Sequence, residues 1–575
     1  MRNIFIVSIL ASVFLLSNTA DGRNNPSSNK KGTNTNSLAA GCQPANSSFE
    51  LRGNNINALI QTGGDMWWDL NNAPRFEVPK GSGRHSMFAG DLWLGGTDVS
   101  GQLKVAAQMY RSSGVDFWTG PLSTETSEID PNTCIEYDKH FYTTRDTVAT
   151  FVAWYDAGLY DAENGTNTQS EDYPNYIIPA VLQDWPAHGR NFDPYNEDYN
   201  LAPFIDRNGD GRYNISDGDY PGYDLFGTVD CSDRKLNIYG DVNLWWIFND
   251  KGNVHTETGA ASIGMEVRAQ AFSFATNDEV NNMTFCNYEL VNRSTFTLTN
   301  TYFGMFADSD LGGSEDDYVG CDVGRGLGFC YNGDDFDDDA NGSTGYGEQP
   351  PAIGIDFFEG PYQDSDEIDN AIGINFNEAL NGVGYGDSIV DNERFGMRRF
   401  LWFNRQGANW GTDPSTGTDY YNYLRGIWKD GTKMIFGGNG HSTSGGMEAD
   451  FMFPGESDPA NWGTKGVDPG YPADGGWTEA NEQTTPADRR FVQSAGPFTL
   501  TPGAVNDITV GIVWARATSG GNLASVEAVR RADDKTQAMF DNCFRVLNGP
   551  DAPELDVQEL ENQLILYIEN PKNSN

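Results

Sequence analysis

Apolar and polar residues alternate over several stretches of this chain. In residues 263–275, IGMEVRAQAFSFA, every second residue from Met265 to Ala271 is apolar, and the residues between them are charged or polar. Successive side chains of a β-strand point to opposite faces, so this period of two indicates a strand with one buried face and one solvated face.

Two further stretches predict pairs of strands. Residues 283–291 (MTFCNYELV) and 295–306 (TFTLTNTYFGMF) are separated by NRS, which favours a hairpin. Residues 496–517 (GPFTLTPGAVNDITVGIVWARA) place a Pro502-Gly503 turn between two strand patterns. With 66 glycines and few helix-forming runs, the sequence predicts a mainly β fold of antiparallel, β-sandwich-like sheets with long loops and a few helices.

One helix is expected late in the chain, where Asn522 can act as its N-cap. An apolar stripe follows: Leu523, Val526, Val529, Met539, Phe540 and Cys543. We expect this helix to pack on the preceding sheet. Residues 549–575 are predicted to be a linker and the start of an incomplete further domain, because the single strand pattern QLILYIEN cannot fold alone. Either the sequence is truncated there, or this tail pairs with the body.

The first 45 residues carry an export signal. Residues 1–20 combine Arg2, an apolar run and Ala20, which is typical of a secretory signal peptide. The apolar run is too short to span a bilayer, and no later segment is long enough. Residues 21–45 predict a flexible polar lead-in, and residues 46–548 a β-rich body of one to three compact units. A lipobox-like AAGC, ending at Cys42, does not directly follow the apolar run, so no lipid anchor is expected.

Composition narrows the classes of function. The chain has 82 Asp and Glu against 37 Lys and Arg, a net charge of −45. This charge repels nucleic acid and anionic membranes and attracts cations. Aromatic residues make up 13%, which indicates a folded chain. We therefore expect a secreted or cell-surface protein with no nucleic-acid partner and no membrane span.

Seven cysteines in an exported chain allow up to three disulfides. Cys321 and Cys330 close the glycine-rich segment CDVGRGLGFC and are the best local pair. Buried free cysteines are the alternative.

The clearest chemical motif is DRNGDGRYNISDGD, residues 206–219. Calcium loops take oxygen ligands from positions 1, 3, 5, 7, 9 and 12 and need glycine at position 6. Gly211 stands at position 6, and the ligand positions hold Asp206, Asn208, Asp210, the Arg212 carbonyl, Asn214 and Asp217. Hard oxygen ligands favour Ca²⁺ over zinc or copper. A solvated turn is the alternative; the agreement of so many constrained positions favours calcium.

The loop is similar to the calcium loop of dockerins, DxNxDGxxNxxD, over twelve residues only. Helix-breaking residues, DGDYPGYDLFG, follow it, so no cohesin partner is implied. We interpret the loop as a structural clip, because ion binding adds folding free energy to a loop that carboxylate repulsion opens. Three other acidic runs, residues 308–322, 332–342 and 363–370, predict either further calcium sites or solvated acidic loops.

The sequence lacks the motifs of common catalytic chemistries. None of its five histidines lies in HExxH, and it has no GxSxG and no GxxxxGK[ST]. Glycosidase chemistry needs two carboxylates at a set separation, and with 82 acidic residues no pair stands out. Trp67-Trp68 and Trp245-Trp246 are candidate sugar-stacking platforms, although core packing is the favoured interpretation for most of them.

Five blocks together carry a family resemblance: EVPKGSGRHSMFAGDLWLGGTD, QLKVAAQMYRSSGVDFWTGPL, WWIFNDKGNVHTETG, SEDDYVGCDVGRGLGFCYNGDD and PADRRFVQSAGPFTLTPGAVNDITVGIVWARA. In this order they resemble large exported surface proteins of Bacteroidota that carry a type IX secretion sorting tail. The resemblance covers most of residues 50–550 and implies a cell-surface or secreted location. It implies no catalytic residue set, and the sorting tail itself is absent from this sequence.

Two functions follow as hypotheses. The first is a calcium-stabilised, non-enzymatic exported protein, serving adhesion or cell-surface architecture by binding an extracellular glycan or surface protein. The second is a carbohydrate-active protein, either a glycan-binding module or a glycoside hydrolase, that uses exposed tryptophans and carboxylates not identified by sequence.

Overall fold

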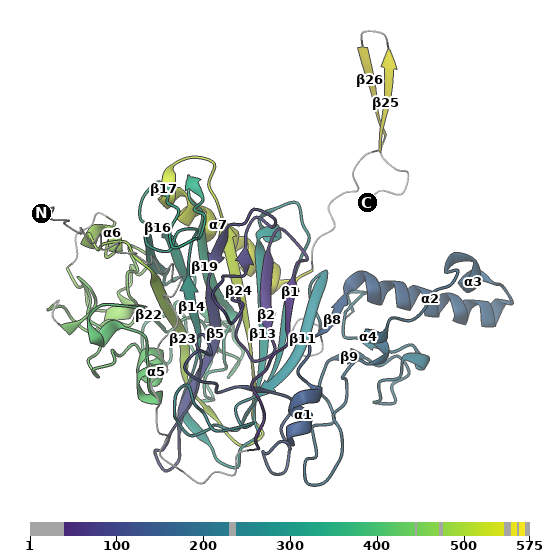
Figure 1. Ribbon diagram of the computed structural model, residues 1–575, viewed down its shortest axis with the longest axis horizontal. Helices are drawn as coiled ribbons and strands as arrows, with labels where there is room; N and C mark the ends of the chain where they lie inside the picture. The colour runs from purple at the N-terminus through teal and green to yellow at the C-terminus, as the bar shows by residue number, and fades with distance from the viewer. Residues whose placement is uncertain are drawn as a thin grey trace, which may run out of the picture.

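The computed structural model describes residues 40–228, 237–442, 445–470, 475–545, 554–560 and 563–569. The predicted signal peptide and most of the polar lead-in lie outside these residues, as do Cys231 and part of the tail. Two antiparallel sheets stand face to face at the centre of the molecule, and a helical arm extends from one side (Figure 1).

The larger sheet has nine strands within the described residues, with β13 and β24 near its middle. In spatial order they are β15 (Asp317–Asp322), β16 (Leu327–Asn332), β19 (Ala352–Glu359), β24 (Val505–Ala515), β13 (Met283–Asn292), β12 (Met265–Ser273), β11 (Val242–Asn249) and β7 (Trp118–Thr119), while β8 (Phe141–Thr144) also pairs with β11.

The facing sheet has five strands among the residues that the structure describes, and β14 is its central strand. They are β22 (Arg399–Asn404), β23 (Arg489–Leu500), β14 (Leu298–Ser309), β5 (Ala89–Asp98) and β6 (Leu103–Ala106). A smaller four-stranded sheet contains β1 (Ser48–Leu51), β2 (Asn57–Gln61), β3 (Phe76–Glu77) and β4 (His85–Met87).

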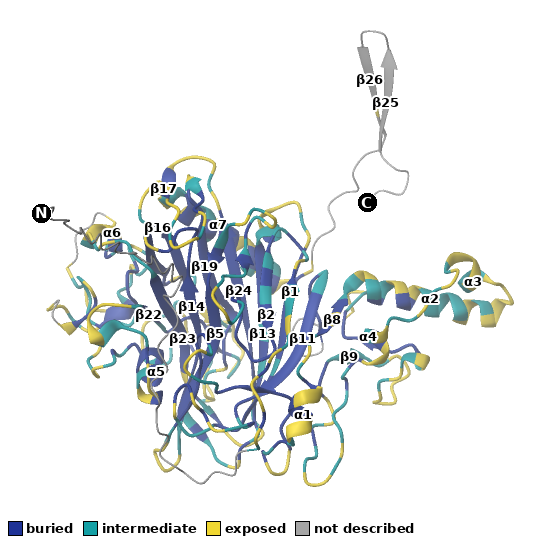
Figure 2. Cartoon of the chain, in the orientation of Figure 1, coloured by how far each residue is buried: buried dark blue, intermediate teal, exposed yellow. Residues whose placement is uncertain are grey.

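The main core fills the space between the two large sheets. Phe303 of β14 lies 5.6 Å from Phe357 of β19 and 6.1 Å from Tyr288 of β13, measured between ring centroids, so it bridges the sheets. The strands are buried along most of their length (Figure 2). The predicted fold class, mainly β with antiparallel, sandwich-like sheets and few helices, is confirmed.

The two predicted hairpins are wrong. β13 pairs with β12 and β24, whereas β14 pairs with β5 and β23, so each predicted pair is divided between the two sheets. Their connections are corners of the sandwich, and they contact each other. The Asn292 backbone N–H donates to Ala504 O at 3.0 Å, and Gly503 N–H donates to Asn292 O at 2.8 Å. A corner uses the same turn residues as a hairpin, so the local pattern does not separate them.

The expected solvated face of residues 263–275 is also wrong. β12 buries its polar residues as well as its apolar ones, and Glu266 is fully buried. Arg268 lies 3.0 Å from Glu266 and 2.8 Å from Asp198, which belongs to the arm, and Arg293 contacts the same two carboxylates. The alternation therefore correctly separates an apolar face of β12 from a polar face. The polar face is covered by an ion-pair network rather than by water.

The arm, residues 145–226, covers the outer face of the larger sheet beside β11 and β8 (Figure 1). It contains α2 (Arg145–Asn164), α3 (Thr168–Asp172), α4 (Ala180–Gln183) and the short strands β9 (Phe204–Ile205) and β10 (Tyr220–Pro221), while α1 (Pro131–Glu136) precedes it. Phe151 of α2 and Leu182 of α4 pack in one cluster with Trp245 and Ile247 of β11. The arm is therefore fixed to the sheet at its base.

Helix α7 (Gly521–Asp541) covers another part of that outer face, as predicted. Its N-cap is Gly520 rather than Asn522, because side chains from another loop satisfy its first N–H groups. Asp335 accepts from Asn522 N–H at 3.0 Å, and Gln349 accepts from Gly521 N–H at 3.0 Å. Val526, Val529 and Phe540 of the predicted stripe are buried, whereas Leu523 is 57% exposed.

Long loops surround the sandwich and carry the remaining short elements. These are β17 (Phe336–Asp337), β18 (Gly347–Glu348), β20 (Gly382–Val383), β21 (Arg394–Phe395), α5 (Gly417–Leu424) and α6 (Glu479–Glu482). In the tail, β25 (Glu554–Leu560) pairs antiparallel with β26 (Gln563–Glu569), so the single expected strand has a local partner. Among the described residues, no helix combines the length and apolar character needed to cross a membrane.

The predicted Cys321–Cys330 pair is wrong. In the β15–β16 ladder Cys321 pairs with Gly328 and Cys330 with Val319, so both cysteines are buried and unbridged. Cys42 instead forms a disulfide with Cys134, with a Cα–Cα distance of 6.0 Å.

Candidate functional sites: the 206–219 loop and a loop-walled pocket

The six predicted calcium ligands belong to one loop of the arm, but within the described residues the carboxylate oxygens of Asp206, Asp210 and Asp217 do not all come within 4.8 Å of one another. A ladder between β9 and β10 pairs Ile205 with Tyr220 and closes the base of the loop. A short 3₁₀ helix, Ile215–Asp217, brings the end of the loop back toward its beginning. The sequence motif therefore forms a closed turn on a two-stranded support.

Asp206, at position 1, organises the loop backbone. Its carboxylate oxygens accept from Gly209 N–H and Gly211 N–H, both at 2.7 Å. Gly209 and Gly211 have φ values of +73° and +75°, a region that favours glycine. The Gly211 hydrogen bond is the main cause that lowers the pKa of Asp206, which therefore stays ionised. The glycines are needed for the chain to wrap around this carboxylate.

The side chains at positions 3, 5, 9 and 12 face one another. Asn208 Nδ2 lies 3.3 Å from both Asp210 Oδ2 and Asp217 Oδ2, and Asn214 Nδ2 lies 2.7 Å from Asp217 Oδ2. The oxygens of the same two amides point to the loop backbone, where Asn208 Oδ1 accepts from Asp210 N–H at 2.9 Å and Asn214 Oδ1 accepts from Ser216 N–H at 3.1 Å. This donor set, carboxylate and amide oxygens with a backbone carbonyl at Arg212, fits the ligand chemistry of calcium.

Asp219, the last residue of the loop, shows how crowded the negative charge is. Its carboxylate accepts from Arg207 N–H at 2.9 Å and from Asn214 N–H at 2.8 Å. Burial raises the pKa of Asp219, and the charges on Asp206 and Asp217 raise it further. A bound cation would offset this repulsion.

The loop also joins separate parts of the arm. Gly218 has a φ of +88°, and a Cβ there would come within 2.5 Å of the Tyr155 ring on α2. Arg207 lies 2.7 Å from Asp156, also on α2. On the other side, Tyr213 donates its hydroxyl to Leu182 O of α4 at 2.5 Å. A loop held in shape thus holds α2 and α4 together.

A second acidic cluster, Asp308, Asp310 and Asp488, has ligand atoms within 4.8 Å of one another, among the residues that the structure describes. A positively charged side chain of the protein, Arg490, already lies beside this cluster. The buried Arg490 guanidinium lies 3.6 Å from Asp308, 3.5 Å from Asp488 and 3.4 Å from Asp413. These contacts account for Asp308 and Asp488 as the counter-ions of a buried arginine.

The other acidic runs use their carboxylates on loop backbone. Asp337 accepts from Gly313 N–H at 2.9 Å and from Tyr346 N–H at 2.6 Å. Asp369 accepts from Gly386 N–H and Ser388 N–H, both at 2.9 Å. Each of these two carboxylates therefore has a structural task in its own loop.

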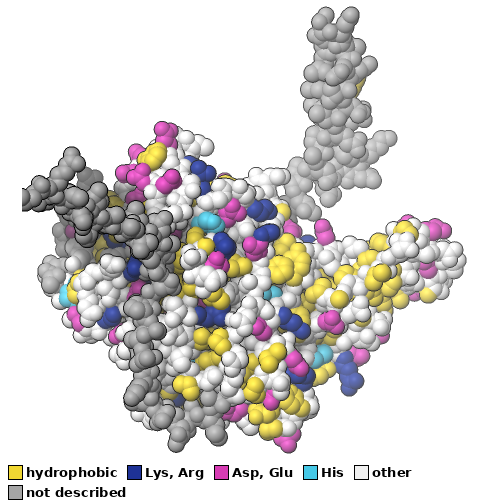
Figure 3. Space-filling view, viewed as in Figure 1, with side chains coloured by type: hydrophobic (Ala, Val, Ile, Leu, Met, Phe, Trp, Pro, Cys, Tyr) yellow, Lys and Arg dark blue, Asp and Glu magenta, His cyan; other side chains and the backbone are white. Residues whose placement is uncertain are grey.

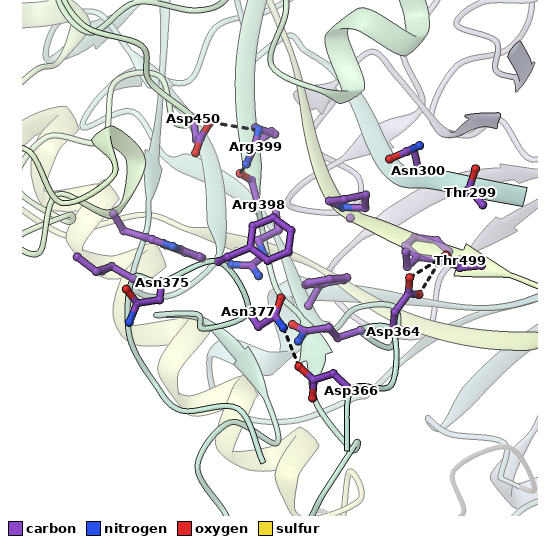
Figure 4. A pocket seen from close by; sticks show the side chains of 18 of the residues that line it. Thr299, Asn300, Asp364, Asp366, Asn375, Asn377, Arg398, Arg399, Asp450 and Thr499 are labelled. Carbon is purple, nitrogen blue, oxygen red and sulfur yellow. Dashed lines mark hydrogen bonds and ion pairs between the residues drawn. The ribbon is translucent and has the colours of Figure 1, made fainter. Parts of the chain in front are cut away.

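A pocket of about 710 Å³ lies at one end of the five-stranded sheet, far from the 206–219 loop in sequence. The ends of β14 and β23, the loop between β19 and β22, and residues 450–465 form its walls. Figure 4 shows Arg398, Arg399 and Asp450 together, with Asp364, Asp366 and Asn377 below them. The pocket thus places cationic, acidic and aromatic groups around one space.

Most of the charged groups in the pocket have partners. Asp450 lies 3.3 Å from Arg399 Nε and also pairs with Lys465. Asp364 accepts from Thr499 N–H at 2.6 Å and from its hydroxyl at 2.7 Å. Arg398 differs: within the described ranges its side chain donates one hydrogen bond, from Nη1 to the backbone oxygen of Glu378 at 3.0 Å.

Sequence reasoning did not find this pocket. Its residues lie between positions 299 and 499 in loops of mixed composition, and the acidic run 363–370 is the one part of it with a sequence signal. The tryptophans named as candidate platforms are elsewhere, because Trp67, Trp68, Trp245 and Trp246 are all at most 2% exposed. The core interpretation is therefore confirmed for all four. The aromatic residue at the pocket rim is Phe376, which is 92% exposed.

Comparisons with known proteins do not assign the chain to a family. No protein-family model matches the chain, and no curated protein matches it significantly.

Proposed function

We propose that this chain is an exported, non-enzymatic protein of the cell surface or extracellular space, stabilised by Ca²⁺ at residues 206–217 and serving adhesion or cell-surface architecture. Residues 1–20 and the resemblance to exported surface proteins of Bacteroidota support the location. The observation that carries the calcium part is the convergence of Asn208, Asp210, Asn214 and Asp217 in one closed loop.

The arm supports the proposed role in adhesion. Its exposed apolar side chains include Ile177 (81%), Phe226 (67%) and Tyr160 (54%). Figure 3 shows hydrophobic side chains along the arm. Exposed apolar groups of this kind are suited to contact with another surface. A calcium clip that keeps α2 and α4 together would hold them in a fixed arrangement.

Thermal unfolding with and without calcium tests the proposal. We expect the melting temperature to rise when calcium is added to chelator-treated protein, because a ligand that binds only the folded state stabilises it. Asp206→Ala should abolish this rise. Asp98→Asn is the matched control, since Asp98 also accepts backbone N–H groups in an exposed turn. Equal melting temperatures in chelator and in calcium would contradict the calcium part of the proposal.

A second candidate function is carbohydrate binding, and the pocket of Figure 4 is the observation that favours it. Sugar sites combine an apolar platform with polar groups that hydrogen-bond hydroxyls. Phe376 offers the platform, and Asp366, Asn377 and Asn300 offer the polar groups. A glycan array with the full chain tests this candidate; an array without any binding would contradict it.

A further inference from the structure

Arg398 is a buried arginine whose charge has no acidic partner. Only 8% of its surface is exposed. Its guanidinium lies 4.9 Å from the Phe395 ring centroid and 4.9 Å from that of Trp462. One nitrogen donates to Glu378 O at 3.0 Å, and among the described residues no carboxylate forms an ion pair with it. The pKa of Arg398 is lowered to about 10, mainly by burial, with a smaller contribution from the charge on neighbouring Arg399.

A buried cation of this kind is costly unless an anion compensates it. The rings occupy the space beside the guanidinium, and the Glu378 carbonyl takes one of its five N–H donors. Because the guanidinium lines the pocket, donors remain for an incoming carboxylate, which can accept two parallel hydrogen bonds. Arg399 and Lys465, by contrast, already share Asp450.

The rest of the pocket selects against a highly charged ligand. Asp364 and Asp366 lie in the same pocket and are held in place by Thr499 and Asn377 (Figure 4). Two carboxylates would repel a second negative charge on the ligand, but they accept hydrogen bonds from hydroxyl groups. The net charge of −45 on the whole chain also disfavours polyanions.

The rim adds an apolar surface. Phe376 is 92% exposed, and Ile374 beside it is 36% exposed. An exposed aromatic ring stacks well on the C–H face of a sugar ring, and at this position it would cover a ligand whose carboxylate points toward Arg398.

We propose that this pocket binds a sugar unit that carries a single carboxylate, such as a uronic acid within a glycan. Arg398 binds the carboxylate, Asp364 and Asp366 accept from the hydroxyls, and Phe376 covers the ring. The inference rests on the carbohydrate-binding candidate and names its ligand class; it needs no calcium at residues 206–217.

Calorimetric titration of the full chain tests it. The probes are oligosaccharides containing glucuronate, galacturonate or mannuronate, each paired with its carboxyl-reduced form. We expect one of the acidic probes to bind at least about tenfold more tightly than its reduced form, the scale of a charge-assisted bidentate contact. Arg398→Gln should remove this preference. Phe376→Ala should weaken binding about tenfold without affecting folding, because the side chain is exposed. Phe336→Ala, at an exposed aromatic outside the pocket, is the matched control.

The outcomes distinguish the specificity for an acidic sugar from carbohydrate binding itself. Equal binding of the acidic and reduced forms would overturn the acidic specificity and leave carbohydrate binding in place. An absence of binding to every probe would overturn both. Equal binding of a peptide with a free C-terminal carboxylate would assign the pocket to a peptide and overturn the proposal. If Arg398→Gln misfolds, the Phe376→Ala result decides, and unchanged affinity there overturns the placement.

Discussion

Two acidic clusters in this molecule are built on opposite principles. The 206–219 loop gathers its carboxylates within one short, exposed segment. Among the described residues, the cation of this loop that forms an ion pair is Arg207, and its partner is Asp156 on α2 rather than an acid of the loop. The cluster around Asp308 and Asp488 draws on distant parts of the chain and surrounds the buried Arg490. Only for the first of these do we propose a cation from solution. An acidic cluster is therefore a metal candidate only after the protein's own cations have been counted.

The largest expected effect is at Arg490. Arg490→Met should destabilise the fold by about 3–5 kcal/mol, because it leaves buried carboxylates without their counter-ion. Urea unfolding followed by tryptophan fluorescence measures the loss. Adding Asp308→Asn to the same variant should restore part of the stability, since it removes one uncompensated charge. A loss below about 1 kcal/mol would mean that these acids do not depend on Arg490.

The next effect is on the arm. Calcium at a hundredfold excess over its dissociation constant should stabilise the loop by about 2.7 kcal/mol, and the gain should protect α2 and α4 from limited proteolysis. Mass spectrometry of the fragments locates the cleavage sites. In chelator, cleavage should begin in residues 145–226, and Asp206→Ala should be cut there even with calcium present. Cleavage that begins in the sandwich would separate the loop from the stability of the arm.

A third arrangement, a buried acid with no direct cation, extends the comparison. Asp356 lies beside α7, and its Oδ1 has no hydrogen-bond partner among the described residues. Burial raises the pKa of Asp356 to about 8. The folded state therefore holds this proton to higher pH than the unfolded state does. The contribution of Asp356 to stability falls as pH rises between about 4 and 8, by up to about 1.4 kcal/mol per pH unit.

Asp356→Asn checks this dependence, because asparagine keeps the shape and does not titrate. We expect the variant to lose stability less steeply with rising pH in that interval, as measured by urea unfolding at several pH values. Asp541→Asn, on an exposed position of α7, is the control and should keep the wild-type slope. An unchanged slope in Asp356→Asn would place the titrating group elsewhere.

These comparisons also explain what the sequence could predict. The proposed calcium ligands lie within twelve residues, so their spacing alone predicted that they belong to one loop. The alternation in residues 263–275 and the stripe after Asn522 likewise predicted a strand and a helix that form. Strand partners were not predictable, because the turns after β13 and β23 each lead to a strand of the opposite sheet, which local residues do not encode. The pocket is not predictable for the same reason, since Arg398, Asp364 and Trp462 line one space only in the tertiary fold.

The smallest expected effect is on the contact that Arg207 of the loop makes with α2. Arg207 lies 2.7 Å from Asp156, and its side chain also lies 5.3 Å from the Tyr155 ring centroid. An exposed ion pair of this kind contributes only about 0.5 kcal/mol, because solvent screens it. Arg207→Ala should therefore lower stability by about that amount equally in chelator and in calcium. If the loss instead appears only in calcium, the ion pair depends on the bound ion, and the loop and α2 form a single calcium-dependent unit.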